Sequence, residues 1–408
     1  MLNNCRALDL TDEKGFLCGK ILADLGVEVI KVERPGGDEA RTIGPFYRDI
    51  PAPDHSLYWW AYNSNKKGLT LNLESGEGRD LFRRLAAGAD FIIESFKPGY
   101  LDSLELGYTD LVRLKRDIIL TSITPFGPEG RYRDYQVTDI VSMAMSGILY
   151  QTGDLDTRPV HMSLPQACLH AGADAAVGTL LAYYHREQSG EGQQVDVSLQ
   201  QSTAWFLANA IPMYELNQIV SRRSGSFRWS MKSSQRQVWK CRDGFVFFNI
   251  IGGRTGAKTL FELVQWMESE GYQDEYLHNT DWERLDMFAV NQDVVDRISR
   301  PIETFFGNHT RAEIAEGAAR RRISVCPLSS MQDLHNDRQL AVRDFWTKVR
   351  HPGLEEDITY PRSYIKSSVV DYKIDRPAPQ AGQHNQEIYG SLGLSAEEQK
   401  ALSLKGVI

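Results

Sequence analysis

The sequence predicts an α/β protein with a parallel, twisted sheet in its N-terminal part, followed by a smaller α+β domain. Up to about residue 125, short apolar segments with a strand period alternate with segments that have a helical period. The helical segments are about ten residues or longer, which suits right-handed βαβ crossovers between parallel strands. The composition then changes near residue 221, where a polar stretch interrupts the apolar pattern.

The first crossover shows the pattern most clearly. Residues 7–10 form a short apolar strand, and residues 16–25 have a helical period with their large apolar side chains on one face. Gly26 closes this helix. Residues 27–33 (VEVIKVE) alternate between apolar and charged side chains and are expected to form the next strand.

The alternation continues along the N-terminal part. Further strands are expected at 69–73, 90–96 and 117–124, and helices at 77–87 and 101–115. Residues 167–187 form a helix rich in Ala and Gly, whose small side chains let neighbouring backbones approach closely. We therefore expect this helix to be buried at a domain or subunit contact. A strand at 193–199 and a helix at 200–216 follow.

The polar segment 221–237 has the composition of a linker or flexible loop. After it, the pattern predicts a hairpin of residues 238–241 and 244–250, and helices at 258–270, 291–306 and 311–321. This arrangement is typical of a small α+β domain. Strand and loop patterns return from about residue 323, and an amphipathic helix is expected at 396–404.

Composition argues against several classes of partner. The formal net charge of −8 disfavours nucleic acid, which requires clustered Lys and Arg. The arginine run 320–322 fits a solvated helix end better than a binding patch. No apolar run reaches the roughly 18 residues that a membrane-spanning helix requires. The N-terminal residues lack the features of a secretory signal.

The cysteine spacing and the missing motifs exclude further kinds of site. The five cysteines are far apart and form neither a CxxC pair nor a disulfide framework, and no Cys/His group has metal-ligand spacing. We therefore expect a reduced, soluble, cytoplasmic protein without a metal. The GxGxxG and GxxxxGK[ST] motifs are absent, so the sheet resembles a Rossmann fold without the phosphate loop that binds NAD or ATP. The HExxH, GxSxG and EF-hand patterns are also absent.

Five segments carry a resemblance to a known family. They are LADLGVEVIKVERPGGDEAR (22–41), NSNKKGLTLNL (63–73), ESFKPGYLDSLELGY (94–108), SGEGQQVDVSL (189–199) and the C-terminal stretch 376–408. In this order they resemble the family III CoA-transferases, which include formyl-CoA transferase, the carnitine CoA-transferases and α-methylacyl-CoA racemase. The resemblance covers nearly the whole chain.

The resemblance implies a fold and an assembly. Family members have a large Rossmann-like domain built from both chain ends and a smaller domain from the middle, and two subunits interlock like linked rings. On this plan, residues 1–220 are the N-terminal part of the large domain, 221–325 form the small α+β domain, and 326–408 return to the large domain. The small-residue helix 167–187 also suits an interlocked dimer.

The resemblance also implies a chemistry. In the family's transferases, an Asp carboxylate attacks an acyl-CoA thioester, which gives a mixed anhydride and free CoA thiolate. The thiolate then attacks the anhydride, leaves an aspartyl-CoA thioester and releases the first acid. The incoming carboxylate repeats these steps in reverse, so the thioester energy is conserved. Coenzyme A or acyl-CoA and a small carboxylic acid are the implied ligands.

This chain departs from the family at the nucleophile. The family's Asp lies ten residues before a Gly that matches Gly178, which places the Asp position at Cys168. Asp174 is nearly two turns away on the same helix. Cys168 has two interpretations, either a thiol nucleophile that forms an acyl-S-Cys intermediate or a small buried apolar residue in a packed helix, which we favour. The racemase branch needs a His before an Asp, and Thr138 stands there, so we assign no catalytic residue.

Several positions that contact the substrate in the family are also altered. Glu74, Ser103 and Gln136 stand where formyl-CoA transferase has Lys, Arg and Lys. Because CoA phosphates need such charges, their loss should weaken binding. In the first loop, Lys14 takes the place of a Gln, where a cation would crowd an acyl group or bind an acidic substrate.

Three positions keep the family pattern and are the candidate CoA-binding residues. Arg34, Leu71 and Phe96 match residues that pack on or pair with the nucleotide. Arg34 has an equally simple structural interpretation, an ion pair with Glu33 or Asp38.

Three hypotheses follow. The chain is a non-catalytic subunit that pairs with an Asp-bearing paralogue, as in heteromeric members such as succinyl-CoA:(R)-benzylsuccinate CoA-transferase. Alternatively, it is an autonomous CoA-transferase that uses Cys168 or a carboxylate brought from elsewhere. The third hypothesis is a scaffold or binding protein that keeps the fold without CoA chemistry.

Overall fold

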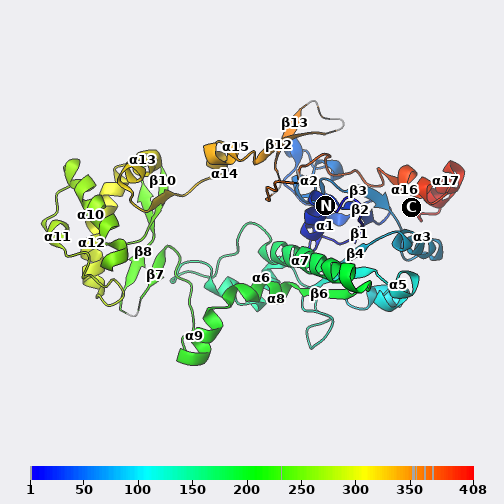
Figure 1. Cartoon of the computed structure of the whole chain (residues 1–408), viewed down its shortest axis with the longest axis horizontal. Coiled ribbons are helices and arrows are strands. Elements are labelled where there is room, and N and C mark those ends of the chain that lie inside the picture. The colour runs from blue at the N-terminus through cyan, green and yellow to red at the C-terminus, as the bar shows by residue number, and fades with distance from the viewer. Residues whose placement is uncertain (1, 231, 352–353, 355, 363, 370–371) are drawn as a thin grey trace. The chain divides into compact units, whose positions relative to one another are not determined.

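The computed structural model describes residues 2–230, 232–351, 354, 356–362, 364–369 and 372–408. The chain divides into two compact units, and most of their helices and strands are labelled in Figure 1. Unit 1 comprises Met1–Leu149, His161–Val220 and Gln339–Ile408, so it is built from both chain ends. Unit 2 comprises Tyr150–Val160 and Ser221–Arg338.

These units differ from the expected ranges 1–220, 221–325 and 326–408 at two segments. Residues 326–338 belong to unit 2 because β11 (Val325–Pro327) pairs with a strand of that unit and Arg311 donates to Leu328 O at 2.8 Å. Residues 150–160 also belong to unit 2, where the Thr157 carbonyl accepts from Arg223 at 2.6 Å.

Unit 1 is organised around a six-stranded sheet in which all neighbouring strands are parallel. The order is β3-β2-β1-β4-β5-β6, which is the Rossmann order. The strands are β1 Arg6–Leu10, β2 Glu28–Glu33, β3 Lys67–Thr70, β4 Phe91–Glu94, β5 Ile119–Thr124 and β6 Gln194–Ser198. The order reverses between β1 and β4, so a ligand crevice is expected beyond the carboxyl ends of these two strands.

Helices cover both faces of this sheet, which is why most of its strands are apolar at nearly every position. On one face, α1 (Phe16–Asp24), α6 (Asp139–Met145) and α7 (Gln166–Ser189) pack against alternate strand residues such as Ala7 and Phe91. On the other face, α3 (Gly76–Ala87), α4 (Tyr100–Ser103), α5 (Tyr108–Leu114) and α16 (Asn385–Ser391) cover the intervening residues. The two layers give unit 1 its main core.

The C-terminal segment docks on the edge strand β3. The Tyr389 hydroxyl donates to the Thr70 carbonyl at 2.6 Å, and the Thr70 amide donates to Asn385 Oδ1 at 2.9 Å. Further along, the Asn72 amide donates to the Val407 carbonyl at 2.8 Å. Residues more than 300 positions apart therefore complete one edge of the sheet.

Unit 2 has a three-stranded antiparallel sheet in the order β11-β10-β9. Helices α10, α12 and α13 pack against β9 and β10 around buried residues such as Trp239, Phe248 and Trp266. The strands are β9 Val238–Cys241 and β10 Gly244–Phe248, and the helices are α10 Gly253–Ser269, α12 Gln292–Gly307 and α13 Arg311–Arg321. The predicted hairpin and the three predicted helices are therefore present.

The remaining elements are short. They are α2 Leu57–Asn63, α8 Leu199–Ala204, α9 Ala210–Asn217, α11 Glu275–Asn279, α14 Met331–His335, α15 Arg338–Val342, α17 Ala396–Leu404, β7 Phe227–Trp229, β8 Ser234–Arg236, β12 Trp346–Arg350, β13 Asp357–Pro361, and 3₁₀ turns η1 Glu39–Thr42, η2 Tyr47–Asp49, η3 Pro53–His55, η4 Leu149–Gln151 and η5 Trp205–Leu207. In the part of the chain that the structure describes, no helix combines the length and the apolar character that crossing a bilayer requires.

Three expected segments differ from the structure. The helix expected at 101–115 is split into α4 and α5, because Glu105 adopts a left-handed φ of 58° between them. The helix expected at 200–216 is divided into α8, η5 and α9. The polar segment 221–237 is not only a linker, since β7 and β8 pair antiparallel within it.

A buried ion pair fixes the end of β1. The Lys66 ammonium donates to Asp9 Oδ2 at 2.8 Å, to Asn63 Oδ1 at 2.9 Å and to the Phe16 carbonyl at 3.0 Å. Both charged side chains are fully buried. Burial would raise the pKa of Asp9, but the charges of Lys66 and Lys31 outweigh burial and hold the pKa below its usual range.

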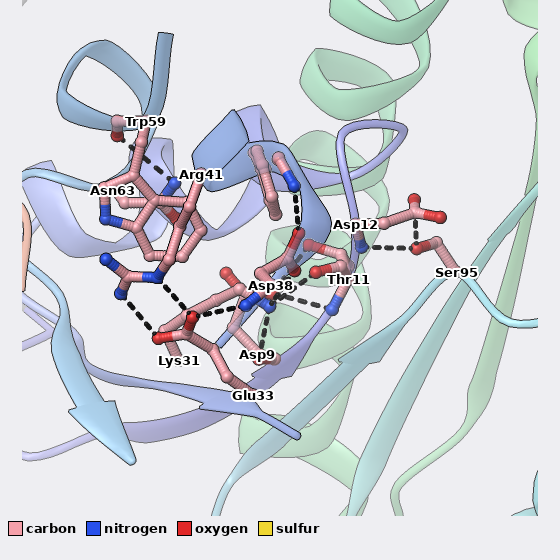
Figure 2. A network of polar contacts seen from close by, with 12 residues as sticks. Asp9, Thr11, Asp12, Lys31, Glu33, Asp38, Arg41, Trp59, Asn63 and Ser95 are labelled. Atoms are coloured by element: carbon pink, nitrogen blue, oxygen red, sulfur yellow. Dashed lines mark hydrogen bonds and ion pairs between the residues drawn. The ribbon is translucent and has the colours of Figure 1, made fainter. Parts of the chain in front are cut away.

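The other oxygen of Asp9 holds the turn that follows β1. Asp9 Oδ1 accepts from the Thr11 amide at 3.0 Å and from the Thr11 hydroxyl at 2.6 Å, and Lys31 on β2 donates to the Thr11 carbonyl (Figure 2). Thr11 is therefore bound through its amide, its carbonyl and its side chain. These hydrogen bonds fix the conformation of the first residue after β1.

A second buried pair connects β2 to the C-terminal segment. The Arg41 guanidinium donates to both carboxylate oxygens of Glu33, at 2.7 and 2.8 Å, as Figure 2 shows. It also donates to the Pro379 carbonyl at 2.9 Å and lies over the Trp59 ring, 3.9 Å from the ring centroid. This bidentate pair orients the polypeptide that follows β2.

Replacing Lys66 with Met tests the importance of the Asp9–Lys66 pair. We expect Lys66→Met to lower the free energy of unfolding of unit 1 by about 3–5 kcal/mol, because a buried carboxylate loses its main partner. Lys67→Met is the control, since Lys67 makes more exposed pairs with Glu28 and Glu387, and its loss should cost about 1 kcal/mol or less. Urea denaturation measures both variants. Equal losses would contradict the prediction.

Candidate functional site

A cavity of about 780 Å³ lies beyond the carboxyl ends of the central strands of unit 1. Its position matches the crevice that the strand order predicts, and its volume suits a cofactor-sized ligand. The lining residues come from the ends of β1 and β2, from the segments that follow β1 to β4, and from near the C-terminus: Leu10, Thr11, Asp12, Glu13, Lys31, Val32, Glu33, Arg34, Pro35, Asp38, Glu39, Leu71, Asn72, Leu73, Glu74, Ser95, Phe96, Tyr100 and Gly406.

The structure brings the three candidate CoA-binding residues together in this cavity. Arg34 follows β2, Leu71 follows β3 and Phe96 follows β4, and all three line the cavity. Leu71 is buried, and the Phe96 ring packs on Tyr100 with ring centroids 4.7 Å apart. That these residues bind CoA stays a prediction.

The ion pair of Arg34 differs from the expected one. Arg34 Nη2 donates to Glu39 Oε1 at 2.7 Å, whereas Glu33 is bound by Arg41. The Arg34 side chain is 65% exposed, so this pair contributes little to stability. The Arg34 cation of the cavity wall therefore already faces a carboxylate.

Carboxylates dominate the charge of the cavity wall. Six carboxylates line it, from Asp12, Glu13, Glu33, Asp38, Glu39 and Glu74, against two cations, from Lys31 and Arg34. Lys31 is buried and donates to backbone carbonyls at the end of β1. Burial raises the pKa of both Glu13 and Asp38, as expected for carboxyl groups that lie together with few free cations. Ion pairs with Lys14, Arg41, Lys31 and Arg34 compensate Asp12, Glu33, Asp38 and Glu39. The excess negative charge of the wall therefore comes from Glu13 and Glu74, and it disfavours a phosphorylated ligand.

The turn after β1 is connected to β4 at the point where the strand order reverses. The Asp12 amide donates to Ser95 Oγ at 2.8 Å, and the Ser95 hydroxyl donates to Asp12 Oδ1 at 2.8 Å (Figure 2). Lys14 pairs with the Asp12 carboxylate. The charge of Lys14 is therefore compensated within its own loop, which weakens the idea that it binds an acidic substrate.

Glu94 is a site residue that the sequence did not reveal. It ends β4, is only 7% exposed, and its Oε2 accepts from the Phe96 amide at 2.7 Å. Burial raises its pKa to about 7, a hydrogen bond from Ser122 opposes this, and the charges of Asp102 and Asp12 add to the increase. Through this hydrogen bond, Glu94 holds the backbone of Phe96 in the position that places the Phe96 side chain in the cavity wall. The available signal was an acidic residue within an otherwise apolar strand.

Cys168 lies in the first turn of α7, 5% exposed, and is not among the residues that line the cavity. The residue before α7 is Pro165, whose side chain makes no capping bond, and Asp139 of α6 takes this role by accepting from the Cys168 amide at 3.0 Å. Asp139 also contacts His161 Nε2 at 3.1 Å.

The environment of Cys168 keeps it protonated. Burial raises the pKa of the Cys168 thiol well above its usual range, and the charges of Asp139 and Glu13 raise it further. Thiolates react and thiols do not, so this residue is a poor nucleophile at neutral pH. Asp174, the nearest Asp along the helix, is exposed. Within the described residues, no cluster of three or more His, Cys, Asp or Glu side chains suits a metal ion.

A parallel sheet in Rossmann order, with a cavity at its switch point, defines an α/β protein of the Rossmann-like class. The family model for CoA-transferase family III matches residues 2–385. This chain belongs to that family, whose members use CoA thioesters as substrates. The family assignment from the five sequence segments is confirmed.

Individual relatives match over nearly their whole length. The chain is 34% identical to the succinyl-CoA:(R)-benzylsuccinate CoA-transferase subunit BbsE of Thauera aromatica, over 99% of this chain and 97% of that one. It is 29% identical to the succinyl-CoA–L-malate CoA-transferase beta subunit of Chloroflexus aurantiacus, over 96% and 94%. A CAIB/BAIF family protein from Brucella suis has a TM-score of 0.79 at 26% identity, over 96% and 99%. The predicted mixed α/β fold, with a large parallel sheet and a smaller sheet, is confirmed.

Glu94 should make stability depend on pH. Its carboxyl pKa is 4.5 in an ordinary setting and about 7 in the folded chain, so the folded state loses stability as the pH rises from about 5 to 7. Glu94→Gln keeps an acceptor for the Phe96 amide and removes this loss, which is about 2–3 kcal/mol. Thermal melting at pH 5.5 and pH 8 compares the two proteins.

The control for this comparison is Glu77→Gln, which replaces an exposed carboxylate on α3. The Glu77→Gln variant should keep the pH dependence of the unchanged protein. If Glu94→Gln and Glu77→Gln showed the same pH dependence, the interpretation of Glu94 would be wrong.

Proposed function

We propose that this chain is the non-catalytic subunit of a heteromeric family III CoA-transferase, which moves CoA between carboxylic acids. A homologous chain that bears the Asp nucleophile performs the chemistry. The observation that carries the proposal is the buried, protonated Cys168 at the position matched to that nucleophile. A mixed anhydride requires a carboxylate, and Cys168 has none to offer.

The alternative of an autonomous enzyme with Cys168 as nucleophile receives less support. Attack by a thiol would exchange one thioester for another, and the acceptor carboxylate would then face an unactivated acyl group. The raised pKa of Cys168 also leaves little thiolate for the first step. Both the chemistry of the reaction and the environment of the thiol therefore favour a Cys168 that takes no part in catalysis.

The cavity supports the same conclusion. Coenzyme A carries a diphosphate and a 3′-phosphate, and the excess negative charge of the wall at Glu13 and Glu74 would repel these groups. Arg34, Leu71 and Phe96 still offer a cation and two apolar surfaces to an adenine nucleotide. We therefore propose that this chain binds CoA weakly, and that the partner provides the productive site.

Similarity to named subunits supports a partner. BbsE and the Chloroflexus beta subunit are each named as one subunit of a CoA-transferase, and both align along almost the whole chain. In the proposed complex the two chains share this fold and interlock, each with a large domain built from both chain ends and a small domain from the middle of the chain. The remaining ligands are acyl-CoA and a small carboxylic acid, and we propose a cytoplasmic complex without nucleic acid, membrane or metal.

Native mass spectrometry of the protein purified from its own source, without denaturation, tests the assembly. The proposal predicts a stable complex with a second, homologous chain of similar size. A homodimer as the sole species would overturn the proposal.

The Cys168→Ala variant distinguishes a non-catalytic chain from an enzyme that uses Cys168 as its nucleophile. In the complex, we expect kcat to change by less than about twofold, because the residue touches no reacting group. Replacing the Asp nucleophile of the partner chain by Ala should abolish transfer. Steady-state kinetics of both complexes measures this. Loss of activity in Cys168→Ala, with the complex still assembled, would instead support the thiol mechanism.

Reversing one charge of the cavity wall tests its role in CoA binding. Glu74→Lys should tighten CoA binding by this chain roughly tenfold at low salt, because a carboxylate that repels phosphate becomes a cation. The gain should decrease at high ionic strength. Glu77→Lys is the matched control, since it makes the same change in net charge outside the cavity lining. Isothermal titration calorimetry with CoA measures both, and equal gains would contradict the prediction.

A further inference from the structure

A second pocket of unit 1, with a volume of about 340 Å³, takes no part in the site described above. Its lining residues come from the segment 41–60, from the connection between β12 and β13, and from the C-terminal segment 378–383. None of the described lining residues is shared with the larger cavity beyond the central strands. The volume suits a small molecule. We call this the Asp54 pocket, after a carboxylate in its wall.

Part of the wall of the Asp54 pocket is apolar. Pro53, Ala378 and the rings of Trp60 and His351 contribute to it. The Trp60 indole donates to the Asp54 carbonyl at 2.9 Å, and its ring centroid lies 4.3 Å from that of His351, so this part of the wall has a fixed arrangement. Burial lowers the pKa of His351, so its imidazole is uncharged at neutral pH and adds no cation to the wall.

The polar part of the wall carries excess negative charge. Among the described residues that line the pocket, Arg41 is the one Lys or Arg residue, and Glu33 already binds it through both carboxylate oxygens, at 2.7 and 2.8 Å (Figure 2). Asp54 accepts from the same guanidinium through Oδ1, at 3.1 Å. Two carboxylates therefore share one cation. The Asp54 side chain is 48% exposed, so a ligand can reach it from solvent.

We propose that the Asp54 pocket binds a small organic ammonium ion that has an apolar body. The ammonium group donates to Asp54 Oδ2, which has no partner among the described residues, and a hydrogen bond between two charged groups is stronger than one between neutral groups. The apolar body lies along Pro53, Trp60 and Ala378, which removes apolar surface from water. An anion would instead meet a carboxylate beside an arginine that is already paired. The site therefore accepts neither CoA nor a carboxylic acid, and it does not depend on the proposed function.

Titration calorimetry of the full chain with three ligands of similar size tests this charge preference. The ligands are 2-phenylethylammonium, its uncharged counterpart 2-phenylethanol and the anion phenylacetate. We expect one ammonium ion to bind per chain, at least tenfold more tightly than the alcohol, and the anion to show no binding. The preference for the ammonium ion should decrease at high ionic strength, because Asp54 is partly exposed. Equal affinities for the ammonium ion and the alcohol, or no binding of the ammonium ion, would overturn the proposal.

The Asp54→Asn variant tests the assigned carboxylate, because it removes the charge and keeps the shape of the side chain. It should bind 2-phenylethylammonium at least tenfold more weakly and bind 2-phenylethanol within about twofold of the unchanged chain. Asp49→Asn is the matched control, since Asp49 is an exposed carboxylate on η2 that does not line the pocket. Equal losses of ammonium binding in both variants would point to general surface charge and would overturn the site.

The Ala52→Leu variant gives an independent test should Asp54→Asn fail to fold. Ala52 lines the pocket and is partly exposed, so a larger side chain fills part of the volume without changing the charge. Both the ammonium ion and the alcohol should bind at least tenfold more weakly, while circular dichroism stays that of the unchanged chain. Unchanged ammonium binding in a folded Ala52→Leu chain would place the ligand elsewhere and overturn the proposal.

Discussion

The Asp9–Lys66 ion pair is the constraint on which the site of this protein depends. It lies fully buried under the end of β1, and Asp9 uses its second oxygen to hold Thr11. The turn that follows is then connected to β4 through Asp12 and Ser95, at the point where the strand order reverses. Buried charges of this kind cost free energy unless each is paired, so the network fixes one geometry for the cavity wall.

Under the proposed function, the chain keeps the fold of its family and leaves the covalent chemistry to a partner. The sheet, the crossover turns and the apolar walls at Leu71 and Phe96 form a cavity beyond the central strands, where we propose that this chain binds CoA weakly. Glu74 places a carboxylate in this cavity wall, and Cys168 is a buried thiol beside Asp139. A cavity can keep its shape through backbone hydrogen bonds and packing while its reactive groups change, because the two depend on different side chains.

The sequence predicted the parts of the fold that local pattern controls. The first crossover and the C-terminal helix at 396–404 lie where periodicity and capping signals place them. The break at Glu105 and the β7–β8 hairpin were missed, since both depend on backbone conformations that apolar periodicity does not report. Resemblance selected Arg34, Leu71 and Phe96, which the fold brings into one cavity. The pairing of Arg34 with Glu39 and the contact of Asp139 with Cys168 depend on three-dimensional packing, so no one-dimensional pattern could supply them.

The central claim is that covalent chemistry occurs on the partner and not on this chain. The most direct measurement is the intact mass of each subunit after brief incubation of the complex with an acyl-CoA. The account predicts a covalent CoA adduct on the Asp-bearing subunit and an unchanged mass for this chain. An acyl or CoA adduct on this chain, mapped to Cys168 by peptide analysis, would contradict it.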